Sequence, residues 1–361
     1  MTEIIDKASN KITIVMAGDE EGGLEKHVIE LSNGLAHRGY QVSVIAHAKY
    51  QNRLNIAINF FAVDLSKSRR NPIILWQLFQ AIKKSQPDVL HVQANKAVVM
   101  VAPLLNWLDV PCVATLHNKK NKLQDFMRFD RVIAVSQQVA AQFKQQDKVR
   151  VVLNGVSMQA ASKALIDKTP TNKTSNDKTS IKAIAIGRLV SAKGFDLLIS
   201  AWQKIDAKLQ IIGDGPDYNA LQSQIYALGL EHHIELLGHR QDVPQLLSQA
   251  DVFIISSRNE GGPYTLAEAL LMQTPVLSTD VGMVAEVLPR ALICEVNNSD
   301  ALHNLLKKYL QDLTDLSALN EPVYEFAKLH LTFDAMLDKT IAVYQELVPE
   351  LIPQTQEHHP V

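Results

Sequence analysis

The sequence predicts an α/β protein of two doubly wound domains, each a parallel sheet with helices on both faces. Short runs rich in β-branched residues alternate with longer amphipathic stretches along most of the chain. A polar segment at residues 158–180 interrupts this alternation, which then restarts. With 361 residues, 47% of them apolar, the chain is long enough for two cores, because a domain typically takes about 100–200 residues.

Before the polar segment the pattern predicts strands joined by helices. A helix over Leu24–Ala36 is indicated by Val28, Leu31 and Leu35, which recur on one face. The strands predicted in this part are Ile12–Met16, Gln41–Ala46, Val89–Val92, Val110–Leu116, Arg131–Val135 and Val149–Leu153.

After the polar segment the same alternation predicts a second sheet. Its strands are Ile181–Ile186, Leu209–Ile212, His233–Leu236, Val252–Ile255 and Pro275–Ser278. Helices are predicted near Phe195–Ile205, Tyr218–Leu228 and Leu266–Met272, and the tail is helical from Ala301, with Asp334–Leu347 as the last helix. We therefore expect an N-terminal domain at 1–157, a linker at 158–180, a C-terminal domain at 181–330, and a terminal helix and tail at 331–361.

Charge is divided unevenly between the two halves. The net charge of −2 gives the whole molecule no bias toward nucleic acid. Residues 1–157, however, carry 20 Lys and Arg against 13 Asp and Glu, a net of +7, and the remainder carries −9. The basic half is predicted to meet an anionic surface or acceptor, and solvated surface charge is an equally weighted alternative.

Cysteine usage and hydropathy indicate a soluble or peripheral protein in a reducing compartment. Cys112 and Cys294 lie far apart in apolar runs, so a disulfide framework or a zinc site is not expected. The N-terminus lacks the layout of a signal peptide. The longest apolar run, Ala97–Leu105, is about half the ~20 residues that span a membrane.

Two glycine-containing turns lead from a strand into a helix. In the first, which runs from Gly18 to Glu25, Gly22 and Gly23 permit close backbone approach, and the first helical N–H groups can bind an anion. The second, Gly187–Gly194, brings Arg188 and Lys193 to the carboxyl end of a strand, where they suit a diphosphate. An ordinary turn remains an alternative for each.

A third constellation places two carboxylates eight residues apart around a helix start. Glu260 follows a strand, and Glu268 lies about one turn into the next helix. Carboxylates accept hydrogen bonds from sugar and ribose hydroxyls, and the helix N-terminus offers N–H groups to phosphate. Pro263 is expected at the first helical position. A capping carboxylate with a solvated glutamate is the structural alternative.

Together these segments resemble the retaining glycosyltransferases of family four. The similarity is carried, in order from about residue 12 to residue 290, by GGLEKHVIELSNGLAHRGYQVSVIA, VLNGV, AIGRLVSAKGFDLLISAW, LQIIGDGPDYNALQ and SSRNEGGPYTLAEALLMQTPVLSTDVGMVAEV. The resemblance implies the GT-B fold, two Rossmann-like domains facing across a cleft, with the C-terminal helix packing back toward the N-terminal domain. Gly282–Glu286 departs from the family pattern, which leaves the donor sugar open.

The resemblance also implies roles for individual residues. Arg188 and Lys193 would hold the donor diphosphate, Glu260 would contact the transferred sugar, and Glu268 would bind the ribose. His117 would lie at the sugar end of the site; a packed strand-end histidine is its alternative. The other residues expected to bind substrate are Gly22, Gly23, Gly187, Gly213, Arg240, Gly262, Tyr264, Thr265 and Leu266.

The implied activity moves a sugar from a UDP- or GDP-sugar to a saccharide or glycolipid acceptor. The family implies retention of configuration, and the sequence has no Asp-x-Asp motif, so neither metal nor cofactor is expected. Such an enzyme would act in the cytoplasm, or peripherally at the inner face of the cytoplasmic membrane, in polysaccharide or lipopolysaccharide synthesis. An epimerase of similar build and a non-catalytic nucleotide-sugar-binding protein remain alternatives.

Overall fold

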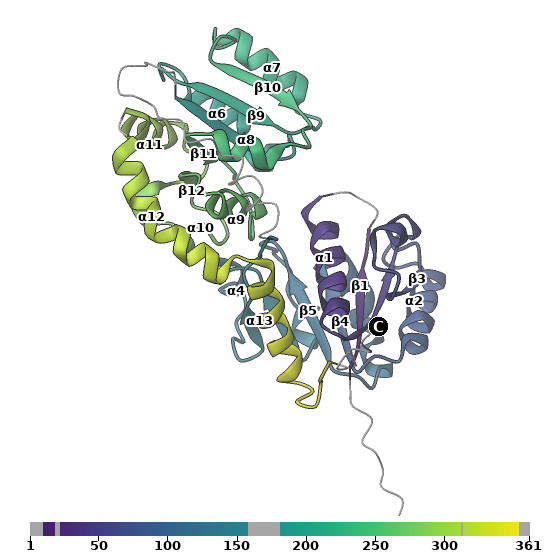
Figure 1. Cartoon of the computed structure of the whole chain (residues 1–361). Helices are drawn as coiled ribbons and strands as arrows, with labels where there is room; N and C mark the ends of the chain where they lie inside the picture. Colours follow the sequence, from purple (N-terminus) through teal and green to yellow (C-terminus); the bar gives the residue numbers. More distant parts are fainter. Residues whose placement is uncertain (1–9, 19–21, 158–180, 312, 354–361) are drawn as a thin grey trace, which may run out of the picture. The chain divides into compact units, whose positions relative to one another are not determined.

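The chain forms two compact units in a computed structural model (Figure 1). The structure describes residues 10–18, 22–157, 181–311 and 313–353, so the predicted linker lies outside the described residues. One unit comprises Met1–Val135, Val139–Val152 and Leu337–Val361, and the other comprises Ser136–Gln138 and Leu153–Met336. The strands of each unit form one sheet.

The first unit contains a seven-stranded parallel sheet in the order β3-β2-β1-β4-β5-β6-β7. Its central strands are buried from end to end, because helices cover both faces of the sheet. Its strands are β1 (Lys11–Met16), β2 (Gln41–Ala46), β3 (Asn59–Ala62), β4 (Val89–Gln93), β5 (Cys112–Leu116), β6 (Arg131–Ala134) and β7 (Val149–Val151).

Helices α2 and α3 close one face of this sheet over a large apolar core. Helix α1 packs on β1 and β2 and buries Val28, Leu31 and Leu35, the three residues whose spacing predicts it. Helices of this part of the chain are α1 (Gly23–His37), α2 (Pro72–Ser85), α3 (Ala94–Val101) and α4 (Gln137–Ala140), with 3-10 helices η1 (Ala48–Arg53), η2 (Ala102–Trp107) and η3 (Phe126–Arg128).

The second unit contains a six-stranded parallel sheet in the order β10-β9-β8-β11-β12-β13. One core lies between this sheet and helices α6, α7 and α11, and it includes the fully buried Trp202. The strands are β8 (Lys182–Ile186), β9 (Lys208–Ile212), β10 (Ile234–Gly238), β11 (Val252–Ile255), β12 (Val276–Thr279) and β13 (Ile293–Cys294).

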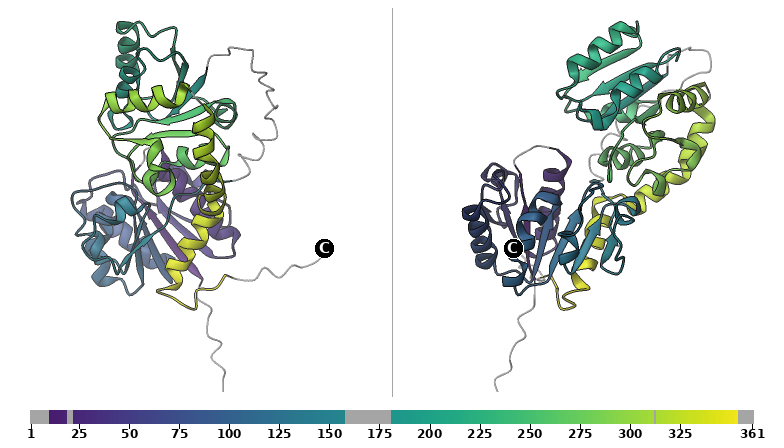
Figure 2. Two further views of the ribbon diagram at one scale, coloured as in Figure 1. Left: turned by 90° about the vertical axis from the view of Figure 1, so that its left-hand side faces the viewer. Right: turned by 180° about the vertical axis from the view of Figure 1, so that it is seen from behind.

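Helices α8, α9 and α12 form a second packed set in this unit. Figure 2 shows α12 as a long helix beside the sheet in both views. The helices are α6 (Phe195–Ala201), α7 (Tyr218–Ala227), α8 (Val243–Gln249), α9 (Tyr264–Leu271), α10 (Val284–Val287), α11 (Ser299–Gln311) and α12 (Leu313–His330), with η4 (Ser191–Lys193) and η5 (Arg290–Leu292). None of the described helices is long and apolar enough to cross a membrane.

The sequence pattern misses the strands β3 and β13. The four residues of β3 are all at least partly exposed, because it is an edge strand, so its sequence lacks a buried apolar run. Strand β13 has only two residues, too few for a periodicity. Both strands form because they pair with a neighbouring strand, and a local sequence pattern contains no information on that pairing.

The last helix, α13 (Phe333–Gln345), packs back on the first unit, as predicted. The Tyr344 hydroxyl lies 2.6 Å from Nδ1 of His91 on β4, and both side chains are buried. Glu346, just after the helix, accepts hydrogen bonds from Arg131 at 2.8 Å and Arg150 at 2.7 Å. A chain segment 196 to 253 residues away is thus tied to three strands of the first sheet.

Replacing Tyr344 by Phe should destabilise the first unit. The change removes a buried hydrogen bond to His91, which typically costs about 1–3 kcal/mol when one partner is left unsatisfied. Urea unfolding followed by far-UV circular dichroism measures the loss. Tyr226→Phe is the matched control, because Tyr226 is 62% exposed and should change stability by less than about 0.5 kcal/mol. Equal midpoints for both variants would contradict the role of this contact.

Candidate functional site

The candidate residues of the second unit gather where the direction of strand progression reverses. Strands β8 and β11 are neighbours in the sheet, and the chain proceeds outward from them in opposite directions. Ligands of open parallel sheets bind at the carboxyl ends of such a strand pair. Residues 187–194 follow β8 and residues 256–263 follow β11, so both predicted loops lie at this edge.

The central contact between the two loops is an ion pair. The Lys193 ammonium binds the Glu260 carboxylate, and both side chains are largely shielded, at 23% and 14% exposed. Ser257 donates a hydrogen bond to the same carboxylate oxygen of Glu260 at 3.0 Å. The structure therefore brings together two of the residues that the sequence selects, one cationic and one anionic, on adjacent loops.

Glycines make this arrangement sterically feasible. A Cβ at Gly187 would lie 3.1 Å from Cε of Lys193, so the missing side chain leaves room for the lysine stem. Gly194 has φ of +65°, and a Cβ there would lie 2.1 Å from the carbonyl oxygen of Ser256. Any larger residue at Gly194 would push the two loops apart.

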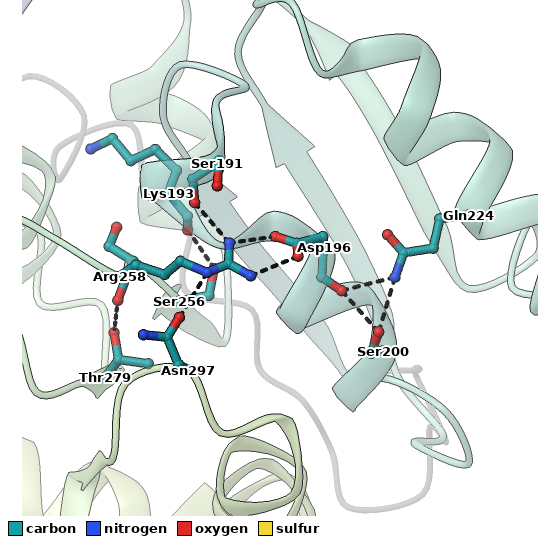
Figure 3. A network of polar contacts seen from close by, with 10 residues as sticks. Ser191, Lys193, Asp196, Ser200, Gln224, Ser256, Arg258, Thr279 and Asn297 are labelled. Atoms are coloured by element: carbon teal, nitrogen blue, oxygen red, sulfur yellow. Dashed lines mark hydrogen bonds and ion pairs between the residues drawn. The ribbon is translucent and has the colours of Figure 1, made fainter.

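Arg258 holds the two loops in register, and the sequence analysis does not single it out. Its guanidinium donates to both carboxylate oxygens of Asp196, each at 2.7 Å, and to the carbonyl oxygen of Ser191 at 2.7 Å. Figure 3 shows this guanidinium between Asp196 and Ser191, with Asn297 accepting from Nε at 2.8 Å. The sequence shows only that an arginine lies two residues before Glu260. That position does not reveal whether the arginine links two loops or is a solvated surface charge.

Helix α9 follows the Glu260 loop directly. It begins at Tyr264, so Pro263 is the N-cap residue. The sequence analysis placed Pro263 at the first helical position, and that prediction is wrong by one residue. Glu268 is the fifth residue of the helix and is half-buried. Upstream, the Asn154 amide donates to the carbonyl oxygen of Gly262 at 2.6 Å, which anchors the loop before the helix.

The remaining candidates of the second unit lie at the same edge of the sheet. Arg188 is exposed on the loop after β8, and Gly213 follows β9. Gly213 packs so closely that a Cβ would lie 1.9 Å from the carbonyl oxygen of Gly187. Arg240 follows β10, and its guanidinium is engaged by Asp242 at 2.6 and 2.8 Å.

The departure from the family pattern at Gly282–Glu286 also lies beside Glu260. A Cβ at Gly282 would lie 2.2 Å from the carbonyl oxygen of Gly261. The Gly282 N–H donates to the Gln138 side chain at 2.8 Å, and Glu286 accepts from the Gln137 N–H at 2.5 Å. These bonds join Gly282 and Glu286 to Gln137 and Gln138, which belong to the same unit. Burial of Glu286 raises the pKa of its carboxyl.

The first unit brings Gly22, Gly23 and His117 to its own reversal point, between β1 and β4. Gly23 begins α1, and one turn later His27 meets His117 edge-on with ring centroids 4.9 Å apart. Nε2 of His117 donates a hydrogen bond to the buried amide oxygen of Gln93, at the end of β4, at 2.8 Å. His27 and Gln93 are absent from the sequence-based selection, because nothing local shows that the start of α1 and the ends of β4 and β5 meet.

Buried imidazoles dominate the electrostatics of this cluster. Burial lowers the pKa of His27 to about 4. It also lowers the pKa of His91 to about 3, with a contribution from the charge of His27. Burial, followed by the charges of both neighbours, lowers the pKa of His117 well below 6.5. All three are therefore neutral at pH 7, and His117 acts as a hydrogen-bonding group and not as a cation.

Two family models match consecutive parts of the chain. The model described as Glycosyltransferase Family 4 matches residues 21–160, and that described as Glycosyl transferases group 1 matches residues 166–325. A relative in Haemophilus influenzae, named an uncharacterized glycosyltransferase, is 26% identical over 342 residues, which cover 85% of this chain and 94% of the relative. The chain therefore belongs to the glycosyltransferase family whose two domains these models describe.

Solved structures share the fold of most of the chain. An Anabaena protein in complex with UDP-glucose matches with a TM-score of 0.75 at 19% identity, over 94% of this chain and 99% of that one. A lipopolysaccharide outer core galactosyltransferase matches with a TM-score of 0.72 at 15% identity, over 93% of this chain and 99% of that one. These matches confirm the predicted GT-B fold of two Rossmann-like domains. The family models give the class and these structures give the fold: the protein is a glycosyltransferase with the GT-B fold. The epimerase and the non-catalytic nucleotide-sugar-binding protein are therefore set aside.

Acid should destabilise the first unit. The pKa of His27 falls from 6.5 in the unfolded chain to about 4 when folded, so the unfolded state binds more protons between these values. Stability is therefore full above pH 6.5 and decreases as the pH drops toward 4, with His27 contributing a loss of about 1–2 kcal/mol at pH ~5. Urea unfolding at pH ~7 and ~5 measures the slope. The difference in unfolding free energy between the two pH values should be smaller in His27→Gln. It should equal the wild-type difference in the control His232→Gln, which alters an exposed histidine.

Arg258→Lys should loosen the loops of the second unit while keeping the positive charge. An ammonium group cannot make the paired bonds to Asp196 together with those to Ser191 and Asn297, so a loss of about 1–2 kcal/mol is expected for this partly exposed network. Thermal unfolding and limited proteolysis at residues 187–194 report the change. The control Arg290→Lys alters an arginine that is 66% exposed, and both readouts should remain at the wild-type level.

Proposed function

We propose that this enzyme is a retaining, metal-independent transferase that moves a hexose from a UDP- or GDP-sugar to a saccharide or lipid-linked acceptor. The acceptor belongs to the synthesis of a bacterial surface polysaccharide or lipopolysaccharide. The donor is bound by the second unit, and the acceptor is recognised by the first. The observation that carries the proposal is the Lys193–Glu260 ion pair at the carboxyl ends of β8 and β11.

Lys193 and Glu260 have complementary tasks in this proposal. The free enzyme holds the lysine against the glutamate, so the two charges keep each other oriented at a shielded position. A donor diphosphate brings negative charge that competes for the ammonium. The carboxylate of Glu260 is then available to accept hydrogen bonds from hydroxyls of the sugar. Arg188, exposed on the same loop as Lys193, supplies a second cation for the diphosphate.

The chemical step follows from charge development. The bond between the anomeric carbon and the diphosphate oxygen breaks, and its electron pair leaves with the diphosphate. Positive charge develops on the sugar ring while negative charge develops on the leaving group. Arg188, Lys193 and the N-terminus of α9 near Tyr264 stabilise that negative charge without a metal ion. The acceptor hydroxyl bonds to the anomeric carbon on the face that the diphosphate leaves, and its proton passes to the leaving group.

Two structural neighbours support the choice of substrates. The Anabaena protein binds UDP-glucose, which supports a nucleoside diphosphate sugar as donor. The galactosyltransferase acts on the lipopolysaccharide outer core, which supports an anionic glycolipid acceptor. The exposed lysines 119, 120 and 122, which follow His117, and the basic group Lys67, Arg69 and Arg70 would meet such an acceptor or the membrane that carries it, at the inner face of the cytoplasmic membrane.

Removing the cations of the β8 loop should lower both donor binding and transfer. A thermal-shift panel of UDP, GDP and their sugars, without metal and with a chelator present, identifies the donor, because a ligand of the folded state raises the midpoint. Arg188→Ala and Lys193→Ala should lose most of that shift. With the identified donor, each should reduce turnover by about 10²–10³-fold, as expected when a group that stabilises developing charge is removed.

Lys182→Ala is the matched control for these variants. Lys182 begins the same strand, β8, at its opposite end, and its side chain is exposed. It should bind nucleotide and turn over donor as the wild type does. Full turnover in a double Arg188→Ala/Lys193→Ala variant would refute the assignment of the diphosphate site. Loss of activity in the chelator, restored by a divalent cation, would refute metal independence.

A further inference from the structure

Two of the three tryptophans in the chain are exposed and line the same hollow of the first unit. Trp76 is 63% exposed and Trp107 is 64% exposed, whereas Trp202 is fully buried in the second unit. A surface hollow of about 340 Å³ separates the two exposed indoles, and its lining is almost entirely apolar. The residues around this hollow are Leu75, Trp76, Phe79, Leu104 and Trp107.

The hollow lies between α2 and η2, where Leu75, Phe79 and Leu104 belong to or pack on the core. Helix α2 buries Ile74, Leu78 and Ile82 against the sheet. Ile73, 66% exposed, and Trp76 lie one turn apart on the outer side of the same helix. With Ile73, the five lining residues form what we call the Trp76–Trp107 surface. Three of these six side chains, Ile73, Trp76 and Trp107, are exposed, and such a group of large exposed apolar side chains marks a binding surface, since folding by itself favours their burial.

Cations lie before α2 and in its last turn, and one of them, Lys67, is ion-paired with Asp64 at 3.5 Å. Between residues 65 and 87 the chain carries Lys67, Arg69, Arg70, Lys83 and Lys84 and neither Asp nor Glu. The arginines are exposed in the turn before α2, and the two lysines are exposed in its last turn. The ammonium of Lys83 lies 5.8 Å from the centroid of the Phe79 ring, directly at the hollow. Asp109, exposed two residues after Trp107, is the acid nearest to η2 in sequence.

This combination of groups matches an anionic bilayer better than a second copy of the chain. A two-fold dimer through this surface would place the same cations opposite each other, because such an interface pairs a patch with itself. A membrane instead offers anionic headgroups to the lysines and arginines. Indole rings, with an apolar body and a polar N–H, favour the layer between headgroups and hydrocarbon.

We propose that the Trp76–Trp107 surface docks the first unit on an anionic lipid bilayer, with both indoles in the interfacial layer. Helix α2 then lies along the membrane plane and does not cross it. This inference deepens the proposed function and rests on it for the acceptor class, since docking holds the enzyme where a lipid-linked acceptor is found. The binding itself requires neither donor nor acceptor.

Vesicle flotation with the full chain tests the proposal. The wild type should float with phosphatidylcholine vesicles that contain phosphatidylglycerol and stay unbound with phosphatidylcholine alone. Trp76→Ser/Trp107→Ser should weaken the partition coefficient by about ten-fold or more, because the interfacial contacts are removed. Leu329→Ser is the matched control: Leu329 is 68% exposed on α12, outside the surface, and its loss should leave flotation unchanged.

Charge and fluorescence give independent readouts. Arg69→Gln/Arg70→Gln/Lys83→Gln should also weaken binding, and raised salt should weaken it in the wild type. Tryptophan emission should shift to shorter wavelength on binding and should be quenched by brominated lipid, while the buried Trp202 contributes a constant background. Absence of the shift, or equal flotation of the double tryptophan variant and the wild type, would overturn the proposal.

Two further measurements separate the alternatives. A concentration-dependent dimer in sedimentation equilibrium that is lost in Trp76→Ser/Trp107→Ser would assign the surface to a second copy and overturn the membrane assignment. The same double variant should retain the wild-type thermal shift with nucleotide. Nucleotide binding without vesicle binding would overturn the docking proposal alone, whereas vesicle binding without any nucleotide binding would overturn the proposed function alone.

Discussion

The pairing of β8 with β11 in the middle of the second sheet is the constraint on which the candidate donor site depends. Their carboxyl ends are adjacent, and the chain leaves them in opposite directions, so two loops meet that are about 70 residues apart in sequence. Lys193 and Glu260 can pair only because of this adjacency. Gly187 leaves room for the lysine stem, and Arg258 ties the loops through Asp196 and Ser191. None of these contacts between the two loops could form if β8 and β11 were not paired.

The first unit has the same strand topology but different side chains at its reversal point. At its reversal point it places neutral imidazoles, not an ion pair, between α1, β4 and β5. Tyr344 extends this polar cluster to α13, because its hydroxyl contacts His91 on β4. The same strand ends at Gln93, which accepts the hydrogen bond from His117. A buried, hydrogen-bonded cluster of this kind restricts the orientation of its members more strongly than solvent-exposed groups would be restricted.

The outer side of the first unit has a different physical character from its ligand edge. Helix α2 is apolar on both sides over its first turns, with Ile74 and Leu78 in the core and Ile73 and Trp76 at the surface. Periodicity alone cannot explain this, because a helix needs only one apolar face to fold onto a sheet. We assign this second apolar side, on a helix with cations before it and in its last turn, to membrane binding, and α2 carries none of the candidate substrate residues.

The sequence by itself determined the two-domain α/β architecture, most strand positions and the loops that carry Arg188, Lys193, Glu260 and Glu268, because strand–helix alternation and glycine-containing turns are local signals. Tertiary structure alone decided which loops meet. It paired Lys193 with Glu260, recruited Arg258 as a brace, brought His27 and Gln93 to His117, and joined Tyr344 to His91. The edge strands β3 and β13 depend equally on their neighbours. These outcomes depend on strand order and long-range packing, for which a local pattern carries no information.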